Sequence, residues 1–105
     1  MQRYYDIAKK PILAGSFSCQ SIDSGLKVNQ DSCIKIVSTQ QKRADFFEWY
    51  AKNCLKTKYT IGYHWFKLVD GNYNFGLVNN EDEPYNILVD RMEEINSMIY
   101  NLHDN

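Results

Sequence analysis

The sequence predicts a small α/β domain in which two parallel strands are each followed by a helix. Short segments rich in apolar, β-branched or aromatic residues at 11–17 and 59–66 are typical of strands. Longer segments at 39–55 and 84–102 have the apolar spacing of helices. Helices of this length between strands suit right-handed crossovers, which make neighbouring strands parallel. We therefore expect residues 1–105 to form one domain of two βα units.

The first strand is predicted over residues 11–17. Pro11 ends a helical tail that we predict over residues 1–10, because proline disfavours helical geometry in the residue before it. The apolar run after Pro11 stops at small polar residues near Ser18, as expected of a strand that is buried on both faces of a parallel sheet. Residues 19–37 have a weak apolar pattern and many turn-forming residues, which predict a long loop.

The helix at 39–55 is predicted to begin with a capping box. The Ser38 hydroxyl can accept the backbone N–H of Gln41, while the Gln41 side chain reaches back. One face of this helix is apolar, formed by Ala44, Phe47, Ala51, Cys54 and Leu55. Further predicted core residues are aromatic: Tyr4, Tyr5, Phe46, Trp49 and Tyr50.

The second strand is predicted over residues 59–66, after a polar break, and a turn follows at Asp70-Gly-Asn72. The helix at 84–102 opens near Pro84, which is tolerated in a first helical turn. The preceding acidic cluster could be mistaken for an acid/base site, and we interpret it as the cap of this helix: Glu81, Asp82 and Glu83. An amphipathic stripe then runs along the helix: Leu88, Met92, Ile95, Ile99 and Leu102.

Composition and charge exclude two classes of partner. The chain is 44% hydrophobic and 24% charged, and no apolar run reaches the roughly 20 residues that cross a bilayer, so we expect a soluble protein without a membrane partner. Twelve basic and thirteen acidic residues give a net charge of -1 without a basic stripe, which argues against nucleic acid. No apolar segment of a signal peptide follows the N-terminus, so we expect a cytoplasmic or truncated product.

The three cysteines predict no metal site and no cofactor. Cys19, Cys33 and Cys54 lack the paired spacing of zinc or redox motifs. Because their number is odd, at least one thiol stays free or pairs between chains, which weakly favours a reducing compartment. Cys54 lies near the apolar helix face and is predicted to be a small buried hydrophobic residue.

Several stretches, in the same order, resemble a known group of enzymes. They are Pro11-Ile-Leu-Ala-Gly-Ser-Phe-Ser18, Asp23-Ser-Gly-Leu26, Thr39-Gln-Gln-Lys-Arg-Ala44 and Gly62-Tyr-His-Trp-Phe66. Nearly end to end, the chain is similar to the C-terminal quarter of clan-A glycoside hydrolases, closest to the agarase-like families. The resemblance implies a partial TIM barrel, the last two βα units of a (β/α)8 barrel. A complete barrel needs roughly 250 residues, so most of it is missing here.

The resemblance also implies that the chain lacks the catalytic residues of the family. Ser16 stands where the family carries its strand-seven nucleophile, and the acid/base carboxylate belongs to a strand that this sequence does not contain. Retaining hydrolysis requires both carboxyl groups, so we expect a truncated or degenerate hydrolase that is inactive alone. Serine hydrolysis is disfavoured as well, because no Gly-x-Ser-x-Gly elbow surrounds Ser16 and the sequence indicates no base beside it; the histidines are His64 and His103.

Four residues are candidates for substrate binding. Trp65 resembles the family tryptophan that stacks on a sugar ring, and the alternative is a core aromatic residue. His64 could donate to a sugar hydroxyl or serve a structural role. Asp70 and Asn74 could bind hydroxyl groups, or they could only form turns in a loop that is shorter than in the family.

An isolated pair of βα units predicts particular partners. Two parallel strands leave both sheet edges open, with unpaired N–H and C=O groups. We therefore expect self-association or docking to a complementary barrel fragment, with carbohydrate as the candidate ligand. Two alternatives stay open: one piece of a split hydrolase, and a carbohydrate-binding or protein-interaction module built on Trp65.

Overall fold

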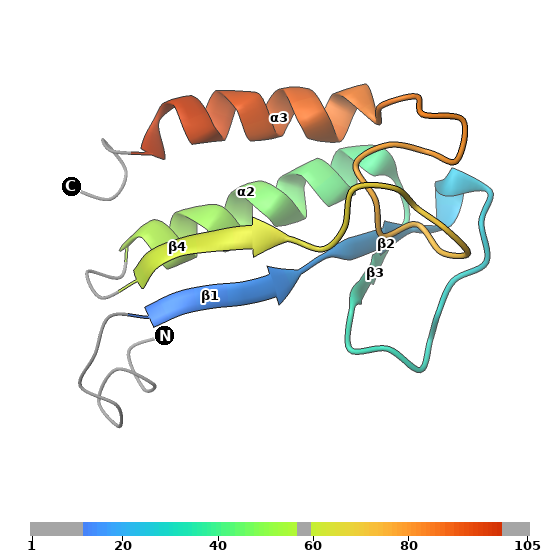
Figure 1. The fold of residues 1–105 in the computed structure, drawn as a ribbon, viewed down its shortest axis with the longest axis horizontal. Coiled ribbons are helices and arrows are strands. Elements are labelled where there is room, and N and C mark those ends of the chain that lie inside the picture. Colours follow the sequence, from blue (N-terminus) through green and yellow to red (C-terminus); the bar gives the residue numbers. More distant parts are fainter. Residues whose placement is uncertain (1–11, 57–59, 100–105) are drawn as a thin grey trace.

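A computed structural model describes residues 12–56 and 60–99 of the chain. Its elements follow one another as β1 (Ile12–Phe17), β2 (Cys19–Ser21), the 3-10 turn η1 (Ile22–Ser24), β3 (Lys35–Val37), α2 (Gln40–Lys56), β4 (Thr60–Trp65) and α3 (Asn86–Ser97) (Figure 1). The helical tail predicted over residues 1–10, and Tyr4 and Tyr5 within it, lie outside the described residues.

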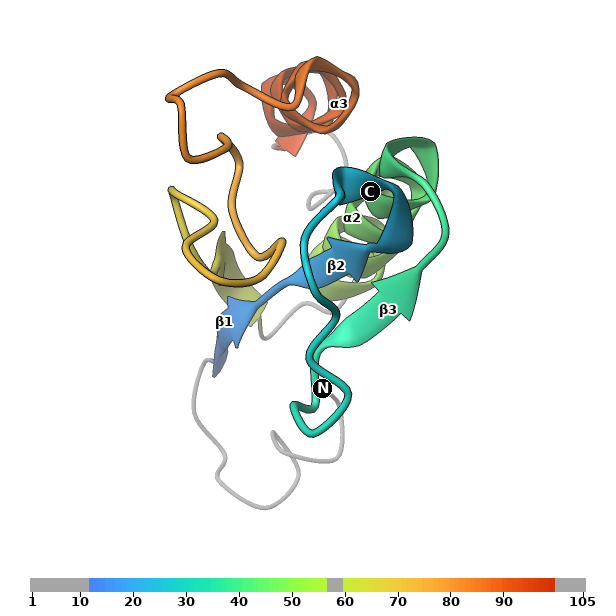
Figure 2. The ribbon, with the colours of Figure 1, turned by 90° about the vertical axis from the view of Figure 1, so that its right-hand side faces the viewer.

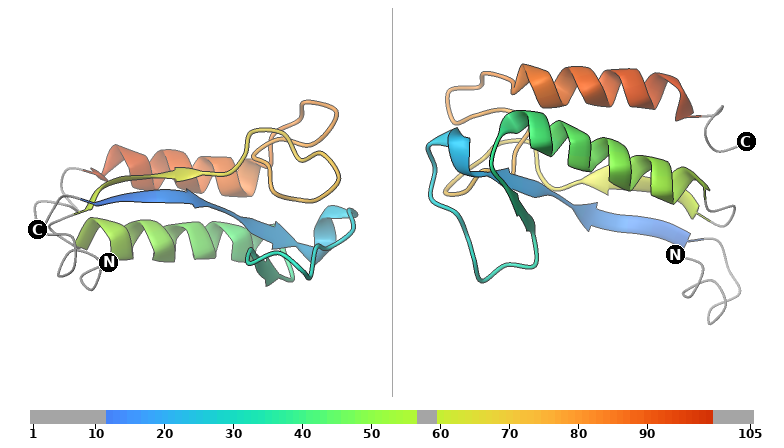
Figure 3. Two further views of the ribbon diagram at one scale, coloured as in Figure 1. Left: turned by 60° about the horizontal axis from the view of Figure 1, so that its bottom comes forward. Right: turned by 180° about the vertical axis from the view of Figure 1, so that it is seen from behind.

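The strands β1 and β4 pair in parallel, as predicted for the segments near 11–17 and 59–66. Ser16 lies opposite His64 in this pairing, and Phe17 lies opposite Trp65. The helix α2 lies behind the strand pair in Figure 1 and in front of it in the rear view of Figure 3, with α3 alongside α2. The structure is thus a small α/β arrangement of parallel strands and two helices.

The segment 19–37, predicted to be a long loop, contains two short strands and a 3-10 turn. The three-residue strands β2 and β3 pair in parallel and form a second small sheet, seen beyond the end of β1 in Figure 2. Gln20 holds the intervening chain, because its Oε1 accepts the Asn29 N–H at 2.8 Å and its Nε2 donates to the Asn29 carbonyl at 2.9 Å. These strands escaped prediction because they are short and carry no apolar alternation: β2 buries polar side chains and β3 is largely exposed.

The helix α2 agrees with the predicted 39–55 segment, but its cap differs. The Thr39 Oγ1 accepts the Lys42 backbone N–H at 3.2 Å, so Thr39 rather than Ser38 caps the helix. The Gln41 side chain donates to Asp45 instead of reaching back to the helix start. The capping-box prediction was therefore wrong by one residue, because adjacent Ser and Thr are both competent caps.

The helix α3 begins two residues after Pro84 and ends at Ser97, inside the predicted 84–102 segment. Residues from 100 onward, including Leu102 and His103, lie outside the described part of the chain.

The acidic cluster does not cap α3, contrary to the prediction. Tyr85 is the N-cap residue, and its side chain makes no capping hydrogen bond. The cluster forms a separate turn instead, in which the Asn79 Oδ1 accepts the backbone N–H groups of Glu81 (2.9 Å) and Glu83 (3.0 Å). Asp82 has a φ of 63°, a left-handed conformation that helices do not contain. The cluster therefore precedes the helix without joining it.

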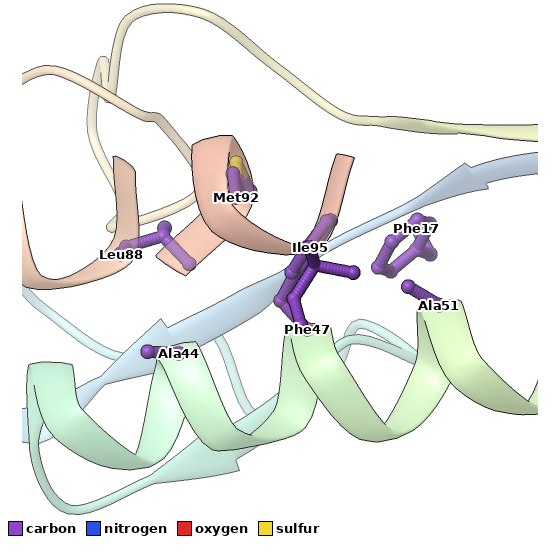
Figure 4. Close-up of a cluster of buried hydrophobic side chains, with 7 residues drawn as sticks. All are labelled: Phe17, Ala44, Phe47, Ala51, Leu88, Met92 and Ile95. Carbon is purple, nitrogen blue, oxygen red and sulfur yellow. The ribbon is translucent and has the colours of Figure 1, made fainter. Parts of the chain in front are cut away.

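The core lies between the strand pair and the two helices (Figure 4). It is built from β1, α2 and α3 by Phe17, Ala44, Phe47, Ala51, Leu88, Met92 and Ile95. The predicted apolar face of α2 is thereby confirmed, with Cys54 and Leu55 buried as well, and the predicted stripe of α3 is confirmed at Leu88, Met92 and Ile95.

Trp49 is not a core residue, contrary to the prediction. Its side chain is 62% exposed on α2, whereas Phe46 and Tyr50 are half-buried and pack against the core. Helical periodicity places Trp49 on the side of α2 opposite Phe47 and Ala51.

Within the described residues, no helix has the length and apolar character needed to cross a membrane.

Candidate functional site

Ser16 and His64 form a hydrogen-bonded pair near the ends of β1 and β4. The Ser16 Oγ lies 2.8 Å from the His64 Nε2, and both side chains are exposed. Neighbouring residues Phe17 and Trp65 pack toward the helices. Because side chains alternate along a strand, Ser16 and His64 lie on the face of the strand pair that the helices leave uncovered.

This pair corrects one expectation from the sequence. A basic side chain does stand beside Ser16, and the parallel pairing of β1 with β4 brings it there from 48 positions along the chain. Within residues 12–56 and 60–99, neither the Ser16 nor the His64 side chain has another hydrogen-bond partner, and no group of three metal-ligating side chains is found. The described part of the chain therefore supplies no third group of the kind that orients the histidine of a hydrolytic triad.

Trp65 faces the helix layer rather than the open face. Its indole N–H donates to the Phe75 carbonyl at 2.8 Å, and its ring meets Phe17 edge-on at 5.4 Å between centroids. The Arg43 guanidinium lies 5.4 Å from the indole centroid. The ring is half-buried, so most of its surface contributes to the core and only part of it faces solvent.

Phe66 is an aromatic residue that sequence analysis did not select. It directly follows β4, and its backbone N–H donates to the Phe17 carbonyl at 2.8 Å, which extends the parallel pairing. Its side chain is 42% exposed, with its ring 6.1 Å from that of Phe75. The alternation His64, Trp65, Phe66 is the signal that could have found it, since Phe66 is two residues after His64.

Asp70 and Asn74 are buried, and their side chains form hydrogen bonds with neighbouring groups of the protein. The Asp70 carboxylate accepts the Gly76 N–H at 2.8 Å, the Asn74 amide at 3.1 Å and the Tyr85 hydroxyl. The Asn74 Oδ1 accepts the Ser21 N–H at 3.0 Å. A Cβ on Gly76 would lie 2.6 Å from the Asp70 nitrogen, so only glycine fits this approach. Both side chains are buried and hold the loop after β4 in shape through these hydrogen bonds.

Arg43 links this loop to β2 and α2. It is completely buried, and its guanidinium donates to the Cys19 carbonyl at 2.7 Å, the Gly76 carbonyl at 2.8 Å and the Gln40 side chain at 2.9 Å. It also lies 5.2 Å from the centroid of the Tyr85 ring. Burial lowers the pKa of Arg43, and burial together with the bond to Asp70 raises the pKa of Tyr85.

A groove of about 410 Å³ opens beside Ser16 along β1. Three aromatic side chains line it, Phe17, Phe46 and Tyr50, together with Ser18 and residues 33–35 next to and within β3. Within the described chain, β4 is the sole strand paired with β1, so the groove follows a free sheet edge.

Comparison with known proteins relates the chain to agarases. No family model matches the sequence. Beta-agarase A of Vibrio sp. (strain JT0107) is 31% identical over an alignment of 101 positions, and the match covers 87% of this chain and 10% of that protein. The structure of an exo-beta-agarase superimposes with a TM-score of 0.87 at 26% identity, over 96% of this chain and 14% of that one. The agarase AgWH50C gives the same TM-score and identity over 98% of this chain and 17% of that one.

The chain thus spans between a tenth and a sixth of the agarases named above. The sequence comparison and the structural comparison both find agarases, and both matches cover most of this chain. The chain is homologous to a short segment of agarases, and this relationship supports the agarase-like resemblance that the sequence motifs indicate.

Proposed function

We propose that the chain is a truncated or degenerate piece of an agarase-like glycoside hydrolase, corresponding to the last two βα units of a (β/α)8 barrel. Two parallel strands with two helices on one side support this assignment, since that is the repeating unit of such a barrel. The short coverage of the agarases supports truncation. On this proposal the chain does not hydrolyse polysaccharides by itself.

The Ser16–His64 pair is the observation that carries the proposal. Retaining glycosidases place two carboxyl groups roughly 5 Å apart across the scissile bond. The motif resemblance puts Ser16 at the nucleophile position, and the hydrogen-bond partner of Ser16 is a histidine. A neutral hydroxyl paired with an imidazole cannot stabilise the positive charge that develops on the sugar ring, which a carboxylate does. On this proposal the site has therefore lost hydrolysis but keeps groups that can bind hydroxyl groups.

Carbohydrate binding at the strand ends is the activity that these groups can retain. His64 is exposed, and its ring nitrogens can exchange hydrogen bonds with sugar hydroxyl groups. Trp65 offers its solvent-facing part, and Phe66 adds an exposed aromatic surface nearby. Asp70 and Asn74 serve the site indirectly, by fixing the loop that follows β4.

Reconstitution tests this proposal most sharply. The chain would be co-expressed with beta-agarase A from which the homologous segment has been deleted, and release of reducing ends from agar would be measured. We expect no hydrolysis by the chain alone or by the reconstituted pair. We expect hydrolysis when the chain carries Ser16→Glu, because a carboxylate then occupies the nucleophile position, and Ser16→Ala is the inactive control. Hydrolysis by the unmodified chain that disappears in Ser16→Ala would contradict the proposal.

The free edge of β1 favours a related role as one piece of a split hydrolase. A strand of a complementary fragment would pair with this edge, and its helix would cover the aromatic groove at Phe17, Phe46 and Tyr50. Co-purification of the complementary beta-agarase A fragment with the chain would support this role. The Ser16→Glu requirement for activity applies to the assembled pair as well.

A further inference from the structure

Trp49 has an unusual environment for a large aromatic side chain. Its indole is 62% exposed, although tryptophan is among the residues that folded proteins bury most on average. It lines a hollow of about 330 Å³ between α2 and α3, on the side of α2 opposite the core residues Phe47 and Ala51. The strand-end site with Ser16 and His64 does not share any of the residues that line this hollow.

The polar groups around Trp49 are held in place by an ion-pair network. Arg91 of α3 reaches across to α2, where its Nη1 lies 3.0 Å from the Asp45 Oδ1 and 3.1 Å from the Glu48 Oε1. The Lys52 Nζ lies 2.7 Å from the other oxygen of Glu48. The bond to Lys52 is the main cause that lowers the pKa of Glu48, so this carboxylate is charged at neutral pH. The rim of the hollow therefore presents fixed donors and acceptors beside one aromatic face.

This combination favours a neutral sugar over an apolar ligand. A pyranose has an apolar C–H face that can lie on an indole, and it carries hydroxyl groups that both donate and accept hydrogen bonds. The Asp45 side chain is 58% exposed, so its carboxylate can accept from such hydroxyl groups while it stays paired with Arg91. A purely apolar partner would instead desolvate Asp45, Glu48 and Lys52 without replacing the lost hydrogen bonds.

We propose that the Trp49 hollow is a surface binding site for a neutral oligosaccharide, separate from the strand ends. Its volume is near the lower end of ligand sites, which run from roughly 300 to 1,000 Å³, and suits one or two sugar rings. Trp49 supplies the stacking face, Asp45 accepts from hydroxyl groups, and Lys52 donates to them. The choice of agar-derived sugars as ligand rests on the proposed function, but the site does not.

The two tryptophans of the sequence allow the two sites to be distinguished. In Trp65→Phe, Trp49 is the sole indole fluorophore, and in Trp49→Phe the sole one is Trp65. Both variants would be titrated with an agar-derived tetrasaccharide. We expect a saturable change in emission in Trp65→Phe. We expect Trp49→Ala to weaken binding at least tenfold by calorimetry, and Trp49→Phe to weaken it less because a stacking ring remains.

A charge control uses two aspartates. Asp45→Asn removes a charged acceptor from the hollow and is expected to weaken binding several-fold. Asp90→Asn on α3 changes an exposed aspartate that does not line the hollow, and it should leave binding unchanged. If Trp65→Phe fails to fold, labelling the unmodified chain with 5-fluorotryptophan gives one resonance for each indole, assigned by the spectrum of Trp49→Phe.

Each outcome decides between the two sites. A response of the Trp49 signal alone supports the proposed hollow. A response of Trp65 alone, with none at Trp49, overturns it and supports binding at the strand ends. The absence of any response at either indole overturns the hollow as an oligosaccharide site, while the proposed hydrolase ancestry is still judged by the reconstitution with Ser16→Glu.

Discussion

Arg43 connects three segments of the chain through a single buried guanidinium. It donates to the carbonyls of Cys19 and Gly76 and to the side chain of Gln40, and it lies over the rings of Trp65 and Tyr85. No carboxylate is among its hydrogen-bond partners in the described residues, so carbonyl dipoles and aromatic faces compensate the burial of its charge. The loop after β4 depends on this residue for its position against β2.

Removal of Arg43 should therefore be costly. Arg43→Met removes the side-chain donors to the buried Cys19 and Gly76 carbonyls, and we expect it to lower the free energy of unfolding by about 2–4 kcal/mol. Arg43→Lys keeps a positive charge but not the planar set of donors, so its effect should be intermediate. Urea unfolding measures both. Lys52→Met, which breaks an exposed pair with Glu48, is the control and should cost less than about 1 kcal/mol. An Arg43→Met protein as stable as this control would contradict the assignment.

The three cysteines should differ sharply in reactivity. Burial raises the pKa of the Cys19 thiol to about 11 and also raises the pKa of Cys54, whereas Cys33 is exposed. A disulfide reagent such as Ellman's reagent at pH 8 should modify one thiol rapidly in the folded chain and all three after denaturation. Cys33→Ser should abolish the fast phase, and a fast phase that survives this substitution would contradict the structure.

The raised pKa of Cys19 also predicts a loss of stability in alkali. The folded chain holds this proton up to about pH 11, whereas the unfolded thiol releases it near its ordinary value of 9.0. The unfolded state therefore binds fewer protons between these values, so the contribution of Cys19 is fully present below pH 9 and is lost as the pH rises to about 11. Urea midpoints measured across this range should fall less steeply in Cys19→Ala than in the unmodified chain. Parallel curves for the two proteins would contradict this linkage.

At the scale of the elements, the buried faces of the helices could be predicted from the sequence, whereas the residue-by-residue pairing of distant strands could not. The faces of α2 and α3 follow from apolar spacing within each segment, and residues such as Phe47 and Leu88 are buried as that spacing requires. The β2–β3 pairing joins two short, polar or exposed strands, whose partners are set by tertiary contacts. The Ser16–His64 bond depends on the parallel register of β1 and β4, which the sequence does not specify residue by residue.

The attachment of α3 can be tested with two neighbouring residues. Leu88 is completely buried against the core, whereas Ile87 is 50% exposed on the same helix. Leu88→Ala should lower the free energy of unfolding by about 2–5 kcal/mol, because it leaves a cavity between α3 and α2. Ile87→Ala removes a similar number of carbon atoms from an exposed position and should cost about 0.5 kcal/mol or less. Thermal unfolding followed by circular dichroism compares them, and equal losses would contradict the described orientation of α3.

For the molecule as a whole, the β1–β4 pair is the feature that governs behaviour in solution. Within the described residues, β1 and β4 pair with each other and with no other strand. The outer edge of each strand therefore carries backbone groups without a strand partner. The aromatic groove at Phe17, Phe46 and Tyr50 runs along one of these edges. A barrel would cover both features, and the chain spans about a tenth of beta-agarase A. We therefore expect the isolated chain to associate through these edges.

Light scattering of the purified chain, combined with circular dichroism, tests this central claim most directly. The chain has a monomer mass of 12.4 kDa, and we predict a larger mass at micromolar concentration that falls on dilution, with helical signal retained. Association through an open edge should also decrease when a complementary beta-agarase A fragment is added, because both compete for the same edge. A folded, monodisperse species of 12.4 kDa at all concentrations would contradict the account.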